Sequence, residues 1–322
     1  MRKNRLFTPG PTPLIPEAQL AMARPMPHHR TSEFAGIMTD CRAKLQQIFR
    51  TTNELLILST TGTGAMEAAV GNLHSPGQKV MIVSAGKFGE RWVELAEAFG
   101  LDFLVLKKAY GTAASAEEIL TCLERNPGIT SLFIQACETS TGTAHDLESI
   151  SRSVRARFPD IMIIVDAITA IGCQEVEVDA WDLDVVVSGS QKSFGIPPGL
   201  SFISLGKRAL EVLARSPGKN YYHLSLLREM KGQEHGSPAF TPSIALVMAL
   251  QEACSRILQQ GLERTIGEAA RIAACTRAGL KALGFGILSD SPANAVTAAL
   301  PPEGIEAGEL KAKLDEWYGI KV

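Results

Sequence analysis

The sequence lacks the features that mark secreted, membrane-spanning and nucleic-acid-binding chains. Its six cysteines show no C-x-x-C spacing, which disfavours a zinc site or a disulfide framework and favours reduced thiols. The longest apolar stretch, IALVMAL, is too short to cross a bilayer. The 32 basic and 34 acidic residues nearly cancel, so no bulk attraction to nucleic acid or to an anionic membrane is expected. We therefore expect a cytoplasmic protein whose partners are small molecules and a second copy of itself.

Seven short aliphatic runs predict the strands of a buried sheet. The runs are continuous rather than alternating, which is typical of strands buried on both faces. Helix-compatible segments lie between several of them, and the segment 89–100 closes on Gly100 as a helix C-cap. This alternation predicts an α/β fold with a mainly parallel seven-stranded sheet flanked by helices. The seven runs are 55–58, 80–83, 103–106, 131–135, 161–165, 185–188 and 201–205.

The character of the chain changes after about residue 243. Two long helical stretches lead into a strand-like segment at 293–300, and a last helical segment ends in GIKV. Because GIKV has the pattern of a strand with no partner left in the chain, we expect the C-terminal part to be incomplete as given. The expected organisation is an N-terminal segment over 1–15, a large cofactor-binding domain over 16–260 and a small α+β domain over 261–322.

Three polar features follow predicted strands, at the edge of a parallel sheet where ligands bind. Lys192 comes shortly after an all-apolar run, and a partly desolvated lysine has a lowered pKa and can form a Schiff base. Asp166 follows five apolar residues, a costly place for a carboxylate unless it meets a cation such as a protonated pyridine nitrogen. The Gly/Thr turn at 61–64 opens a helix and suits a phosphate. Together these three features indicate pyridoxal 5'-phosphate.

A dinucleotide-binding turn is the alternative for the same Gly/Thr stretch. In that motif a third glycine follows, and the next strand ends in an acid that binds the ribose. Here Glu67 stands where the third glycine belongs, and Ser84 ends the next strand. The sequence therefore disfavours a nicotinamide cofactor.

Five stretches carry a more specific pattern: TPGPT, TGTGAMEAAVGNL, ETSTG, VDAITAIG and SGSQKSFGIPPG. In order and spacing they resemble the class V aminotransferases, pyridoxal-phosphate (PLP) enzymes of fold type I. This group includes alanine–glyoxylate and serine–glyoxylate aminotransferases and a branch called the soluble hydrogenase small subunit. The resemblance implies transfer of an amino group from serine, alanine or aspartate to a 2-oxo acid such as glyoxylate or pyruvate. No metal is expected, because no cysteine cluster could bind nickel, iron or an Fe–S centre.

The resemblance implies a role for each residue around the cofactor. Lys192 would bind the cofactor as a Schiff base and would move a proton between substrate and cofactor. Asp166 would pair with the pyridine nitrogen, and Gln191 would add a polar contact beside the lysine. The turn that would cradle the phosphate consists of Thr61, Gly62 and Thr63.

The remaining implied contacts come from four other parts of the chain. Phe88 would stack on the cofactor ring, and either Thr139 or Ser140 would hydrogen-bond the ring hydroxyl, a choice that the sequence leaves open. Thr241 matches a position that reaches the phosphate of the other subunit, which implies a homodimer with shared active sites. Gly10 would bring its backbone near the substrate.

One departure from the family pattern concerns the substrate carboxylate. Family members carry an arginine in a segment resembling RIGH near their C-terminus, and nothing after Arg277 resembles it. Either the chain as given is truncated, which we favour, or it binds the carboxylate differently.

Two other functions stay open. A cysteine desulfurase would share the lysine but needs a nucleophilic cysteine on a mobile loop, whereas Cys254 and Cys275 lie in helical patterns and are expected in the core. A non-catalytic subunit that kept the fold is the second alternative. It is disfavoured because it would have no reason to retain Lys192 and Asp166.

Overall fold

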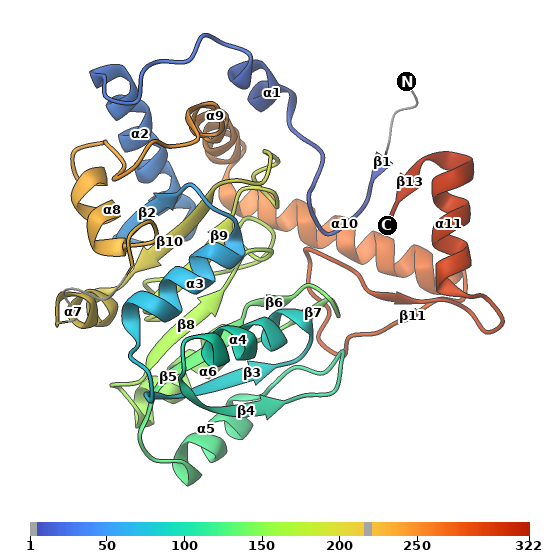
Figure 1. The fold of residues 1–322 in the computed structure, drawn as a ribbon. Coiled ribbons are helices and arrows are strands. Elements are labelled where there is room, and N and C mark those ends of the chain that lie inside the picture. The colour runs from blue at the N-terminus through green and yellow to red at the C-terminus, as the bar shows by residue number, and fades with distance from the viewer. Residues whose placement is uncertain (1–4, 216–220) are drawn as a thin grey trace.

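The computed structural model describes residues 5–215 and 221–322, with a seven-stranded sheet at the centre (Figure 1). Six strands run in one direction, and β10 is antiparallel to both of its neighbours. The seven predicted strands are confirmed, and each end lies within two residues of the prediction. The order across the sheet is β2 (Glu54–Leu58), β10 (Ser201–Leu205), β9 (Val185–Gly189), β8 (Met162–Asp166), β5 (Ile129–Gln135), β3 (Lys79–Ser84) and β4 (Asp102–Lys107).

Helices cover both faces of the sheet, which explains why the strands are mostly apolar and most of their side chains are buried. One exception is β4, where the side chains of 103–106 are only half-buried because the strand lies at the edge of the sheet. The helices whose apolar side chains join the core on one face are α3 (Gly62–Leu73), α4 (Lys87–Ala98), α7 (Lys207–Arg215) and α8 (Leu226–Gln233). Those on the opposite face are α2 (Ser32–Phe49), α5 (Ala116–Arg125), α6 (Leu147–Arg157) and α9 (Ile244–Gln260), with α1 (Pro16–Met22) packed on α9.

Local sequence signals set several helix ends. Ser115 and Glu118 form a reciprocal capping box at the start of α5, and Thr31 accepts a hydrogen bond from the backbone of α2. Gly100 lies just beyond α4 with φ +65°, as the sequence predicts for a C-cap glycine. Helix α3 begins at Gly62 with Thr61 as its N-cap, so most of the predicted Gly/Thr turn at 61–64 belongs to its first turn.

The C-terminal elements extend away from the sheet along α10 (Figure 1). The predicted strand over 293–300 forms only at its last two residues; Ala293 instead donates a backbone hydrogen bond to Gly142. The expectation that the last strand lacks a partner is wrong, because β13 pairs in parallel with the N-terminal strand β1 (Arg5–Leu6). The C-terminal elements are α10 (Leu262–Ala282), β11 (Gly286–Ile287), β12 (Ala299–Leu300), α11 (Ala307–Tyr318) and β13 (Ile320–Lys321).

The six cysteines are free. Cys41, Cys137 and Cys254 are buried, and burial raises the pKa of their thiols well above the ordinary value. The expectation that Cys275 belongs to the core is wrong, since it is exposed on α10, most of which faces away from the sheet. No helix within the described ranges is long and apolar enough to cross a membrane.

Candidate active site

A cavity of about 140 Å³ opens where β8 and β9 end and where α3 and α4 begin. Eight of the eleven residues predicted to form the site line this cavity. A larger hollow of about 390 Å³ lies beside α6, but its Arg152 and Arg155 are paired with acids, so it offers no unpaired cation. The residues that line the cavity are Thr61, Gly62, Thr63, Phe88, Arg91, Thr139, Asp166, Ile168, Thr169, Gln191 and Lys192.

Asp166, the last residue of β8, presents a carboxylate to the cavity from inside the core. Its side chain is 4% exposed, and one carboxylate oxygen accepts a hydrogen bond from the Ile168 backbone at 2.9 Å. Burial, with a smaller contribution from the nearby Glu138 carboxylate, raises the pKa of Asp166 to about 7, against the Ile168 hydrogen bond and the attraction of Arg91 and Lys192. A cationic partner inside the cavity would therefore stabilise the ionised form of this carboxylate.

Lys192 lies three residues after the end of β9, and backbone contacts hold it in place. Its Nζ donates a hydrogen bond to the Pro9 carbonyl at 2.6 Å, and the Thr12 hydroxyl donates to the Lys192 carbonyl at 2.8 Å. Burial lowers the pKa of Lys192, against the attraction of Asp166. A lowered pKa increases the fraction of free amine, the form that attacks an aldehyde.

The N-terminal segment fits against Lys192 only because Gly10 has no side chain. Gly10 has φ +146°, and a Cβ atom built there would lie 2.5 Å from Lys192 Nζ. The structure therefore places Gly10 beside the cavity, against the amine, although it is not one of the lining residues.

The turn that begins α3 lines the cavity with Thr61, Gly62 and Thr63. The side chain of the N-cap residue Thr61 makes no capping hydrogen bond, so it leaves the first N–H groups of α3 free to bind a ligand. A Cβ atom at Gly62 would lie 2.5 Å from the end of the Ile168 side chain, so a larger residue there would have to displace Ile168. Beside it, the buried Gln191 Oε1 has no hydrogen-bond partner among the described residues.

Glu138, which the sequence interpretation did not single out, fixes the start of α4. Its fully buried carboxylate accepts hydrogen bonds from the backbone N–H groups of Phe88 at 3.1 Å and Gly89 at 2.9 Å. It also accepts from the Ser140 hydroxyl at 2.6 Å, and that hydroxyl in turn accepts from the Lys87 backbone at 3.0 Å. Ser140 thus belongs to the support of α4 and does not line the cavity.

The other candidate for the ring hydroxyl contact, Thr139, lines the cavity. Its hydroxyl lies 2.7 Å from that of Thr169, a lining residue that the sequence interpretation missed. Thr241 lies elsewhere, in a small hollow beyond β2 with His223 and Phe240. Within one chain, therefore, Thr241 is not brought to the cavity.

The cavity satisfies three requirements of PLP with observed features. The lysine amine is half-buried and reachable, a buried carboxylate is positioned for the pyridine nitrogen, and the uncapped N-terminus of α3 offers N–H donors to a phosphate. Fold and site together define a PLP-dependent enzyme. A model of the family described as Aminotransferase class-V matches residues 17–322, and the chain belongs to this family of aminotransferases.

Individual relatives agree with this membership. The soluble hydrogenase small subunit of Synechococcus sp. is 36% identical over 99% of this chain and 83% of that protein. The L-aspartate–glyoxylate aminotransferase of Paracoccus denitrificans is 31% identical over 99% of this chain and 82% of that protein. The crystal structure of a subgroup IV aspartate aminotransferase from Thermus thermophilus superposes with a TM-score of 0.92 at 36% identity, covering 98% of this chain and 88% of that one.

Proposed function

We propose that the cavity is the site where this aminotransferase holds PLP and transfers an amino group between small acids. The observation that supports it most strongly is the presence of Lys192 and Asp166 in one cavity with the free N-terminus of α3. PLP would supply an aldehyde that takes up amines and a ring that withdraws electrons. The residues proposed to hold it are Thr61, Gly62, Thr63, Phe88, Thr139, Asp166, Gln191 and Lys192.

Each proposed contact follows from the position of its side chain. Lys192 would hold the cofactor covalently and, once released by the substrate amine, would carry the proton at the substrate α-carbon. Asp166 would keep the pyridine nitrogen protonated, since the ring cation stabilises a carboxylate that burial alone disfavours. Phe88 would stack on the ring, at the helix start that Glu138 fixes.

The proposed reaction moves an amino group from aspartate, serine or alanine to glyoxylate or pyruvate. Aspartate and glyoxylate occur in the names of the relatives described above, which supports this substrate class. The substrate would enter beside Gly10, whose backbone adjoins Lys192 Nζ.

The proposed working unit is a cytoplasmic homodimer with shared active sites, in which Thr241 reaches the phosphate of the other subunit. Its support is that Thr241 lies outside the cavity of its own chain, near the exposed ring of Tyr222, which packs on Phe240. Exposed aromatic residues of this kind often anchor protein interfaces. We also propose that residues 16–260 form the cofactor-binding domain and that residues 261–322 belong to a smaller one.

The experiment that tests the function follows the visible spectrum of the purified protein in PLP. Addition of aspartate, serine or alanine should convert the spectrum to that of pyridoxamine phosphate, and glyoxylate or pyruvate should restore it. Borohydride reduction followed by peptide mapping should find the label on Lys192. Sulfide release from cysteine would indicate a desulfurase, and a protein that takes up no PLP would indicate a non-catalytic subunit.

A further inference from the structure

The phosphate end of the proposed cofactor site has a charge to balance. A phosphate monoester carries about −1.5 to −2 charges near neutral pH. Thr61, Gly62, Thr63 and Gln191 are neutral, and the N-terminus of α3 offers only about half a positive charge. Lys192 is committed to the covalent bond. A tight site would therefore need another cation at the α3 turn.

Arg91 is the other cation that lines the cavity among the residues the structure describes. It lies on α4, next to α3 (Figure 1), and its Nη1 is 3.3 Å from the Thr63 hydroxyl. Its guanidinium carbon lies 4.9 Å from the centre of the Phe88 ring, one helical turn earlier. The guanidinium thus stands between the phosphate turn and the aromatic residue proposed to stack on the cofactor.

Arg91 also has no acidic partner within ion-pair distance in the described parts of the chain, although it is only partly exposed. Other partly buried arginines of this protein are neutralised: Arg155 and Arg208 both pair with Asp182 and Asp184. The guanidinium of Arg91 has five N–H donors, of which one contact, to Thr63, is taken up within the chain. The remaining donors are available to an anion in the cavity.

We propose that Arg91 binds the phosphate of the cofactor, with Thr63 and Phe88 holding its side chain in place. This inference rests on the proposed function. The anion recognised is a phosphate monoester, and the covalent attachment to Lys192 does not require it. Pyridoxal, which has the same aldehyde and ring but no phosphate, separates the two contributions.

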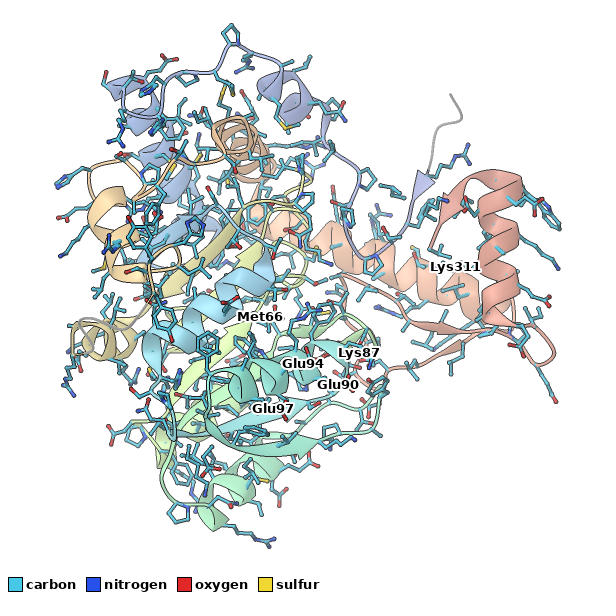
Figure 2. All side chains as sticks on the ribbon, viewed as in Figure 1. Met66, Lys87, Glu90, Glu94, Glu97 and Lys311 are labelled. Carbon is cyan, nitrogen blue, oxygen red and sulfur yellow. The ribbon has the colours of Figure 1, made fainter. Side chains whose placement is uncertain are left out.

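The test compares apoproteins that carry Arg91→Gln, Arg91→Lys or the control substitution Lys87→Gln. Lys87 is a cation on the same helix, near Glu90, with which it pairs, and Figure 2 labels both along α4. Dissociation constants are measured by absorbance titration with PLP and with pyridoxal, in low and high salt, and circular dichroism verifies the fold of each variant.

Loss of charge-assisted hydrogen bonds predicts that Arg91→Gln weakens PLP binding by about 10- to 100-fold. We expect pyridoxal binding to change by less than about threefold, Arg91→Lys to retain part of the PLP affinity, and Lys87→Gln to resemble the wild type. Inorganic phosphate should compete with PLP in the wild type and not in Arg91→Gln. Equal losses for PLP and pyridoxal, or no loss for PLP, would overturn the role of Arg91. Wild-type protein that takes up neither aldehyde would overturn the proposed function and this inference with it.

Discussion

Replacement of Asp166 by asparagine should make the apoprotein more stable at alkaline pH. The folded-state pKa of Asp166 is about 7, against an ordinary value of 3.8. At about 1.4 kcal/mol per tenfold change in proton affinity, the ionised carboxylate costs the fold about 4 kcal/mol above pH 7. Because the folded pKa is the higher one, the stability contributed by this group is complete below pH 3.8 and is lost as the pH rises to about 7. Asparagine keeps the acceptor for the Ile168 N–H and carries no charge.

The pH dependence isolates this effect from other consequences of the substitution. At pH 5 the folded carboxyl is protonated and the unfolded one mostly ionised, so about 2 kcal/mol of the free-energy cost is already present; at pH 8.5 the full cost is present. The advantage of Asp166→Asn over the wild type should thus grow by about 2–3 kcal/mol between these pH values. Guanidinium unfolding of apoprotein, followed by circular dichroism, measures the difference, and Asp160→Asn at an exposed position is the control.

Bound PLP should reverse which of the two proteins is the more stable. Saturating PLP should stabilise the wild type more than Asp166→Asn at pH 8.5, because only the carboxylate can pair with a protonated ring nitrogen. If the free energies of unfolding of the two apoproteins change in parallel from pH 5 to pH 8.5, Asp166 is already ionised in the fold and the argument from its burial is refuted.

Substitutions at three further positions test the supports of the site. Lys192→Ala should abolish borohydride-stable labelling by PLP and lower transaminase activity by about 10²–10⁴-fold; undiminished turnover would exclude this lysine as the base. Gly10→Ala should weaken PLP binding by about tenfold or more, because φ +146° and the contact with Lys192 Nζ both oppose a Cβ atom; titration of the apoprotein with PLP measures it. Glu138→Ala should lower the free energy of unfolding by about 3 kcal/mol, since it leaves the Phe88 and Gly89 N–H groups unsatisfied in the core. Glu138→Gln should lower the free energy of unfolding by less than Glu138→Ala does. Equal denaturation midpoints for the two variants would contradict the capping role.

The sheet was predictable because its signal is local. Each strand is a mostly apolar run, because burial on both faces by helices leaves few polar positions within it. The pairing of β1 with β13 has no such signal, since each partner has two residues and they lie at opposite ends of the chain. The apolar pattern at 293–300 was misleading for the opposite reason: loop contacts such as that of Ala293 with Gly142 satisfy its backbone without a long ladder.

In the site, the two charged residues that follow strands were predictable from the sequence, whereas Arg91 on α4 and the buried Glu138 were not. Lys192 and Asp166 stand out because a charged group directly after an apolar run is rare. Arg91 lies on an amphipathic helix, where an arginine is normally assigned to the solvent face. Its spacing of three from Phe88 was the signal that could have found it, because both then share one helical face. Glu138 begins the stretch ETSTG, and nothing in that pattern indicates that its carboxylate caps a helix some 50 residues earlier in the chain.

The N-terminal segment connects the reactive lysine to the C-terminal elements. Pro9 accepts the Lys192 ammonium hydrogen bond, and the backbone and hydroxyl of Thr12 hold the Gln191 and Lys192 carbonyls. A few residues earlier, the same segment pairs with β13. Residues 180 and 183 positions away along the chain thus set the position of one amine, which no local pattern around Lys192 encodes. Lys192 indicates the chemistry in the sequence, but the position of its amine depends on the N-terminal segment. The Pro-Gly-Pro sequence of that segment does not indicate a contact with Lys192.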